Sequence, residues 1–142
     1  IKKNIVPPRP IYILMLLQMF EANSQLNLDL TSYGHCYQQL IYQAFDKAGI
    51  EKRDFDKYIN ILTEFAWEVF VKDGGLDELG VLSFVDDYSK KYLSVNFEDA
   101  FERLVSNSIL SDRGDLLSFK YPYLYYFFVG KKIAESYSDT GP

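Results

Sequence analysis

A single β-hairpin signal, set among segments with helical periodicity, constrains the fold of this chain most. In residues 109–119, ILSDRGDLLSF, two short apolar runs flank a polar Ser-Asp-Arg-Gly-Asp turn, in which Gly114 can adopt a positive φ. The other periodic segments repeat their apolar side chains every three to four positions, which is the period of a helix. The sequence therefore predicts a mainly α protein with one short, two-stranded hairpin.

Six helices are predicted around this hairpin. They cover about residues 11–22, 32–48 and 53–71, a part of 76–93, a segment that begins at Phe97, and 122–136. Gly49 ends the second helix and the KDGG stretch at 72–75 ends the third, while Asn96 can cap the fifth. Gly80 interrupts the pattern of the fourth helix and leaves its start undefined. Trp67 lies in the long apolar third helix and is expected to pack in the core.

From residue 53 onward the predicted order is three helices, the hairpin and a final helix. That order is typical of a winged-helix domain with an extra helix behind the wing. The PPRP stretch that ends at Pro10 keeps the first residues extended, with Pro10 acceptable in the first turn of a helix. We therefore predict a linker and a small helical subdomain over residues 1–50. A winged-helix domain with a C-terminal aromatic helix would follow over 51–136, and a frayed tail over 137–142.

The charge balance limits the partners that this chain can have. Its net charge is −5, and an acidic domain repels phosphate backbones. The predicted recognition helix carries Glu98, Asp99 and Glu102 against Arg103, so nucleic acid is not an expected partner. The single cysteine, Cys36, excludes an internal disulfide and fits a reducing, cytoplasmic setting. No run of 18 apolar residues is present, so no membrane span is predicted.

The sequence shows no motif for catalysis, metal binding or nucleotide binding. It contains no G-x-x-x-x-G-K-[ST] loop. His35 and Cys36 are adjacent and would point about 100° apart on a helix, so they do not form a metal site or a dyad. A paired-carboxylate hydrolase would need a cleft in which acidic side chains converge, and the sequence singles out no pair. We therefore expect no enzyme activity, cofactor or metal in this segment itself.

The most aromatic segment is 118–134, SFKYPYLYYFFVGKKIA, which ends at the pair Lys131–Lys132. A membrane-surface helix would need a basic face along its length, and a stacking platform for bases would need interleaved cations. Here the cations lie only at the ends, and apolar side chains face several directions, which is typical of a helix that packs against more than one neighbour. We interpret its outer rings as an interface with another domain or subunit. The predicted interface residues are Tyr123, Tyr125, Tyr126 and Phe128.

This aromatic segment resembles the end of the winged-helix domain in NACHT-like signal-transduction ATPases of the STAND class, where the pattern is roughly F-x-H-x-S-F-x-E-Y-F-x-A. Phe119, Leu124, Phe127 and Phe128 fall on its aromatic or apolar positions. Tyr121 falls where the family often has a histidine that contacts the nucleotide phosphate. PRPIYILMLL is similar to the start of the family's helical lid. KYINILTEFAWEVF is similar to the first winged-helix helix, and FERLVSNSILSDRGDLLSFKYP to the last helix and wing.

The resemblance implies a regulatory, non-catalytic segment of a bacterial STAND/NACHT-like P-loop ATPase, whose ATPase core would lie upstream of Ile1. ATP or ADP bound to that core would be contacted by Pro10 and Tyr121, and release of the clamp would permit oligomerisation. The expected partners are the ATPase core and sensor domain of the same parent chain and further copies of it. Several bacterial members of the class act in antiphage defence. The alternative is a free-standing winged-helix adaptor for a protein partner or, if a basic stripe exists, for DNA.

Overall fold

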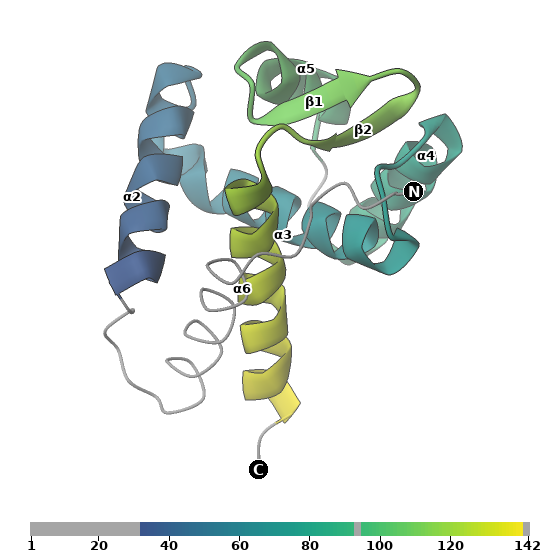
Figure 1. Ribbon diagram of the computed structural model, residues 1–142. Coiled ribbons are helices and arrows are strands. Elements are labelled where there is room, and N and C mark those ends of the chain that lie inside the picture. Colours follow the sequence, from purple (N-terminus) through teal and green to yellow (C-terminus); the bar gives the residue numbers. More distant parts are fainter. Residues whose placement is uncertain (1–31, 93–94, 141–142) are drawn as a thin grey trace.

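The computed structural model describes residues 32–92 and 95–140, with only the backbone described for 32–37 and 137–140. The elements are α2 (Ser32–Lys47), the 3-10 turn η1 (Lys52–Asp54), α3 (Phe55–Lys72), α4 (Glu78–Lys91), α5 (Phe97–Ser106), β1 (Leu110–Arg113), β2 (Leu116–Phe119) and α6 (Pro122–Thr140). The described part is mainly helical with one small hairpin, as predicted. In Figure 1 the hairpin lies over the amino-terminal end of α6, with α2 and α4 on opposite sides. The predicted helix over 11–22 lies outside the described residues.

Side-chain caps set the starts of α4 and α5. The Asn96 side chain accepts a hydrogen bond from the Asp99 backbone N–H at 3.1 Å, so the predicted cap of α5 is confirmed. Asp77 caps α4 in the same way, by accepting a hydrogen bond from the Gly80 N–H at 2.8 Å. The glycine that obscured the start of this helix in the sequence is therefore the donor in its cap.

Three helices end in the same left-handed turn. The residues after α2, α3 and α5 that adopt it are Gly49 (φ 80°), Asp73 (φ 58°) and Ser108 (φ 63°). In each turn the following N–H returns to a carbonyl of the last helical turn, as from Ile109 to Leu104 at 2.9 Å. Gly49 confirms the predicted end of α2. The turns at Asp73 and Ser108 are strained, because the Cβ atom of these residues disfavours the left-handed conformation.

The hairpin has a defined register. β1 and β2 pair in antiparallel fashion with Leu110 opposite Phe119 and Arg113 opposite Leu116. Gly114 has a φ of 64°, as the turn requires. The turn is shorter than the predicted five residues, because β1 continues through Arg113 and leaves only Gly114 and Asp115 between the strands.

A third backbone segment joins the hairpin. The Leu76 N–H, between α3 and α4, donates to the Leu117 carbonyl at 2.9 Å, and the Leu117 N–H donates back to the Leu76 carbonyl at 2.8 Å. Gly75 makes this approach possible, because a Cβ atom there would lie 3.0 Å from the Leu117 carbonyl oxygen. The α3–α4 connection is thus tied directly to β2.

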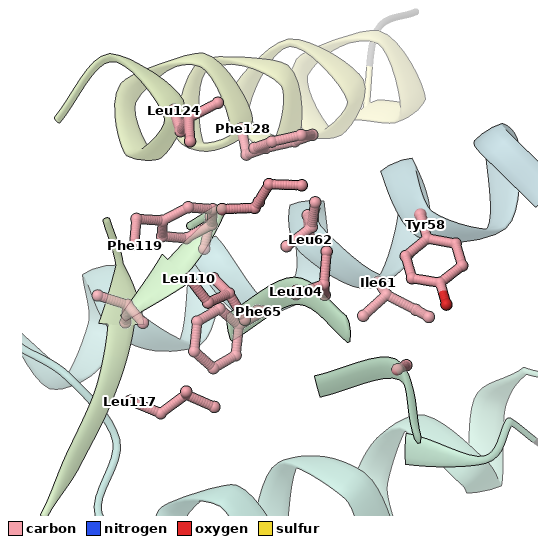
Figure 2. Packing of buried hydrophobic residues seen from close by; sticks show 14 of the residues in the cluster. Tyr58, Ile61, Leu62, Phe65, Leu104, Leu110, Leu117, Phe119, Leu124 and Phe128 are labelled. Carbon is pink, nitrogen blue, oxygen red and sulfur yellow. The ribbon is translucent and has the colours of Figure 1, made fainter. Parts of the chain in front are cut away.

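The described residues form one hydrophobic core, which takes side chains from every described α-helix and both strands. Phe65 of α3 lies near its middle, with its ring 5.7 Å from Phe84 and 5.6 Å from Phe119. Figure 2 shows α6 covering this core through Leu124 and Phe128. The described end of the predicted first subdomain, residues 38–50, packs on this same core.

Trp67 is not part of this core, which corrects the prediction. Its partly buried ring stacks on the exposed Phe70, with the centroids 5.2 Å apart. The buried face of α3 includes Leu62, Phe65 and Val69. Trp67 lies two positions from both Phe65 and Val69, and on a helix that spacing points a side chain away from their face.

α6 continues through Thr140, so four residues of the predicted tail are helical. Residues 131–140 contain neither glycine nor proline, so nothing in that stretch ends the helix. As predicted, both lysines lie within α6: Lys131 pairs with Glu135 at 2.8 Å, and Lys132 with Glu64 of α3 at 2.9 Å. Burial by itself lowers the pKa of Lys132, but the hydrogen bond and charge of Glu64 outweigh burial and leave this pKa raised. The second pair ties α6 to α3.

Candidate functional site

The structure places Tyr121 at the surface, where β2 turns into α6. Its side chain is 44% exposed, and its ring stacks on Tyr123 with the centroids 6.0 Å apart. The Tyr121 carbonyl accepts a hydrogen bond from the Leu124 N–H at 3.2 Å, so this residue forms the start of the helix. Pro10, the other predicted nucleotide contact, lies outside the described residues.

A small pocket of about 330 Å³ lies on the outer face of the hairpin, and its lining includes the residue before Tyr121 in the sequence. The two-residue period of a strand places Ser111 and Arg113 of β1 on this face, together with Ser118 of β2. Lys120, the neighbour of Tyr121, also lines the pocket, and no carboxylate does so among the residues that the structure describes. We call it the outer-face pocket.

The chemistry of the outer-face pocket suits an anion. An arginine fork can bind a phosphate or carboxylate through two hydrogen bonds, and a lysine adds a mobile positive charge. The two serine hydroxyls that line the pocket can also donate hydrogen bonds. The first turn of α6 contains no acidic residue, so no side-chain carboxylate within that turn offsets the positive end of the helix dipole.

The sequence alone pointed to Tyr121, but not to Arg113 or the two serines. A signal for them was present: once Leu110 is assigned to the core, alternation along the strand turns Ser111 and Arg113 outward. Lys120 is the cation at the amino-terminal end of the aromatic segment.

The predicted interface rings lie in two different environments. Tyr123, Tyr125 and Tyr126 are half-buried and pack against the core from its edge. Burial raises the pKa of Tyr125 to about 12, and its ring lies 5.9 Å from Phe119. Phe128, in contrast, is 0% exposed and stacks on Phe119, so it belongs to the core and presents no surface. An interface through the three tyrosines remains a prediction.

The exposed side of α5 is acidic. Glu98, Asp99 and Glu102 face solvent. The guanidinium of Arg103 donates a hydrogen bond to the Ala48 carbonyl at 3.1 Å, next to the end of α2. The guanidinium of this arginine is thus held against the protein. The carboxylates that remain on the exposed side of α5 are negatively charged and would repel a phosphate backbone.

A larger groove, of about 910 Å³, opens on the inner face of the hairpin, toward α4 and α5. Five carboxylates line it, from Asp77, Glu78, Glu102, Asp112 and Asp115. All five residues are exposed to solvent, whereas a paired-carboxylate hydrolase holds its acid in a dry site beside its partner. In the described part of the chain, no three histidine, cysteine or acidic side chains are grouped so that they could hold a metal ion. His35 and Cys36 have no described side chains.

A family model described as Novel STAND NTPase 4 matches residues 76–129 of this chain. The matched segment begins at the Leu76 bridge and ends within α6, so it contains the whole hairpin and Tyr121. The match supports a STAND NTPase-associated region in this part of the chain. No curated protein and no solved structure matches the sequence. Within the described residues, no helix has the length and apolar character that a membrane crossing requires.

Proposed function

We propose that this chain is the helical-lid and winged-helix portion of a STAND/NACHT-like NTPase, and that it regulates the enzyme without taking part in catalysis. The observation that carries the proposal is the coincidence of two features. The segment that matches the STAND NTPase model also supplies Arg113 and Lys120 of the outer-face pocket and the exposed Tyr121, which follows Lys120 in the sequence. ATP or ADP would be held by an NTPase core elsewhere in the parent chain.

The order of the elements supports the winged-helix part of the proposal. It runs from α3 to the extended Leu76, then through α4 and α5, and closes with β1 and β2. A helix, a short strand, two helices and a two-stranded wing make up a winged-helix domain. Leu76 adds an isolated antiparallel bridge to β2, at the edge of the two-stranded sheet.

In the proposed mechanism, the outer-face pocket lies over the phosphates of the bound nucleotide in a closed state. Arg113 and Lys120 would neutralise phosphate charge and Tyr121 would donate a hydrogen bond, while Pro10 would lie beside the base. A nucleotide that makes different contacts in the closed and open states shifts the balance between them. Opening would free the domain for oligomerisation, with the tyrosines of α6 as the seam to the following sensor domain. A cytoplasmic signalling role, such as bacterial antiphage defence, is the proposed setting.

The test uses the protein encoded by the complete reading frame and measures the dissociation rate of a fluorescent ADP analogue. Arg113→Ala should release it at least about tenfold faster, because a charge-assisted hydrogen bond contributes roughly 1.5–3 kcal/mol. Tyr121→Phe, which removes only the hydroxyl, should have a smaller effect in the same direction. Lys91→Ala removes an exposed cation from α4, away from the pocket, and serves as the matched control.

Two results would contradict the proposal. One is a reading frame without a P-loop upstream of Ile1. The other is an unchanged release rate in both pocket variants. In the first case the second candidate, an adaptor for a protein partner, becomes the better interpretation, and the exposed Leu79 and Leu82 on α4 are the observation that favours it.

A further inference from the structure

The inner-face groove combines an apolar surface with a rim of one charge sign. Its floor includes Phe101 and Val105 of α5 and Leu117 of β2. Its wall on α4 is formed by Leu79 and Leu82, which are 75% and 59% exposed. Two leucines three positions apart lie on the same side of a helix, so they present a continuous apolar strip to solvent.

The charged residues that line the groove are all acidic. Asp77 and Glu78 lie at the start of α4, Glu102 on α5, and Asp112 and Asp115 on the hairpin. No lysine or arginine among the described residues lines the groove. Carboxylates from three parts of the fold therefore line the groove, and each contributes a negative potential over the same opening.

We infer that the inner-face groove binds a cationic amphipathic helix of a partner protein. Apolar side chains at helical spacing would enter between Leu82 and the floor, and lysines or arginines beside them would meet the acidic rim. An added strand is the poorer fit, because Leu76 already occupies the edge of β2 at Leu117 through two backbone hydrogen bonds. The groove lies on the face opposite the outer-face pocket, so this inference does not rest on the proposed nucleotide contacts.

The first experiment measures peptide binding to the full 142-residue chain by fluorescence anisotropy. The probe is a labelled peptide of about five helical turns that has leucines on one face and lysines on the other. A matched peptide has glutamate in place of every lysine. The lysine peptide should bind with a micromolar dissociation constant that weakens as salt is added, and the glutamate peptide should not bind. Absence of lysine-peptide binding, or equal binding of both peptides, overturns the inference.

Paired variants then locate the binding site. Leu82→Ser should weaken lysine-peptide binding at least about fivefold, whereas Val71→Ser, an equally exposed residue (59%) on α3, should not. Glu102→Lys should weaken it by a similar factor, whereas Glu98→Lys, on the same helix but outside the groove, should change it far less. All four side chains are exposed or carry surface charge, so the fold should tolerate the changes. Equal losses in groove and control variants would mean non-specific attraction and would overturn the inference.

Two results would assign the groove to a different occupant, and each would overturn the inference. If the chain self-associates in sedimentation velocity and Leu82→Ser makes it monomeric, the groove belongs to a second copy. The chain's own first twenty residues carry Lys2, Lys3 and Arg9 and no carboxylate. If the lysine peptide binds only after these three residues are changed to glutamate, the groove belongs to that segment.

Discussion

The two strands of the hairpin contain eight residues, which alternate between an inner and an outer face of opposite chemistry. On the inner face, Leu110, Leu117 and Phe119 enter the core, and Asp112 continues that face into an acidic groove. On the outer face, Ser111, Ser118 and Arg113 line a pocket without any described carboxylate. Asp112 and Arg113 are neighbours in sequence, yet they contribute opposite charges to surfaces on opposite sides of the sheet.

This difference follows from the two-residue period of a strand. A helix would place neighbouring charges about 100° apart on one continuous surface, where they would partly cancel. A strand turns successive side chains to opposite faces, so eight residues can carry two separate potentials. A two-stranded element tied to α3–α4 by the Leu76 bridge can thus present a positively charged side and a negatively charged side together.

The largest effect is expected from breaking the inner face. Phe119→Ala removes a ring that lies 5.6 Å from Phe65 and 5.9 Å from Phe128, and should lower the free energy of unfolding by about 3–5 kcal/mol. Leu116→Ala, on the outer face and 47% exposed, should change it by no more than about 0.5 kcal/mol. Urea unfolding followed by circular dichroism measures both. Similar losses in the two variants would mean that the faces are not energetically distinct.

A substitution at Gly75 tests whether the bridge holds the two faces in place. Gly75→Val introduces atoms within 3.0 Å of the Leu117 carbonyl oxygen and should cost about 1–3 kcal/mol. It should also speed amide hydrogen exchange at Leu76 and Leu117, because their mutual hydrogen bonds must lengthen. Gly114→Ala is the control: its new Cβ meets nothing, and only the positive φ is strained, at about 1 kcal/mol. Unchanged exchange at Leu76 in the valine variant would contradict the prediction.

The pH dependence of stability reports on packing behind the inner face, where Tyr125 contacts Phe119. Burial raises the pKa of this phenol from 10.0 to about 12 in the folded protein. A raised pKa stabilises the fold fully below pH 10, and that stabilisation is lost as the pH rises toward about 12. The free energy of unfolding should therefore fall over this range, and Tyr125→Phe should make the fall shallower. Urea unfolding of both proteins at a series of pH values, with pH 7 as the reference, measures this fall. An equal dependence of the free energy of unfolding on pH in the two proteins would contradict the prediction.

The smallest effect is expected at the turn that leads into the hairpin. Ser108 adopts a left-handed conformation (φ 63°) between α5 and β1, and Ser108→Gly should stabilise the protein by about 0.5–1 kcal/mol because glycine has no Cβ atom. Asn107→Gly, at φ −106°, should instead destabilise it, since the asparagine side chain donates a hydrogen bond to the Arg103 carbonyl at 2.8 Å. Thermal unfolding of the two variants should shift in opposite directions. A destabilised Ser108→Gly would show that the turn is not strained.

Much of the local structure could be predicted because its causes lie within a few residues. Gly114 and the apolar runs beside it predicted the hairpin, and Asn96 predicted the start of α5, since turns and caps are decided by neighbouring backbone groups. The KDGG stretch predicted the end of α3, whereas the end of α5 was harder, because Ser108 adopts a left-handed conformation for which a serine gives little signal. Asp77 belongs to the same local class, and its role as a cap was missed because Gly80 masked the helical pattern.

The candidate site was predicted only in part. Tyr121 was identified through a resemblance, and its exposed position beside the hairpin allows the proposed role. Phe128 was grouped with the interface tyrosines because a ring-rich helix gives no indication of which ring turns inward. Burial of Phe128 depends on Phe119, which comes from another element.

The sequence by itself determined the order of the elements, the hairpin turn and the alternation that turns Arg113 away from Leu110. These features depend on contacts within a few residues, so chain position is enough to specify them. Only the tertiary structure decided the Leu76–Leu117 bridge, the Lys132–Glu64 pair between α6 and α3, and the groove where α4, α5 and the hairpin meet. Each of those joins residues at least 40 positions apart or on three separate elements, and such a meeting depends on how the whole core packs.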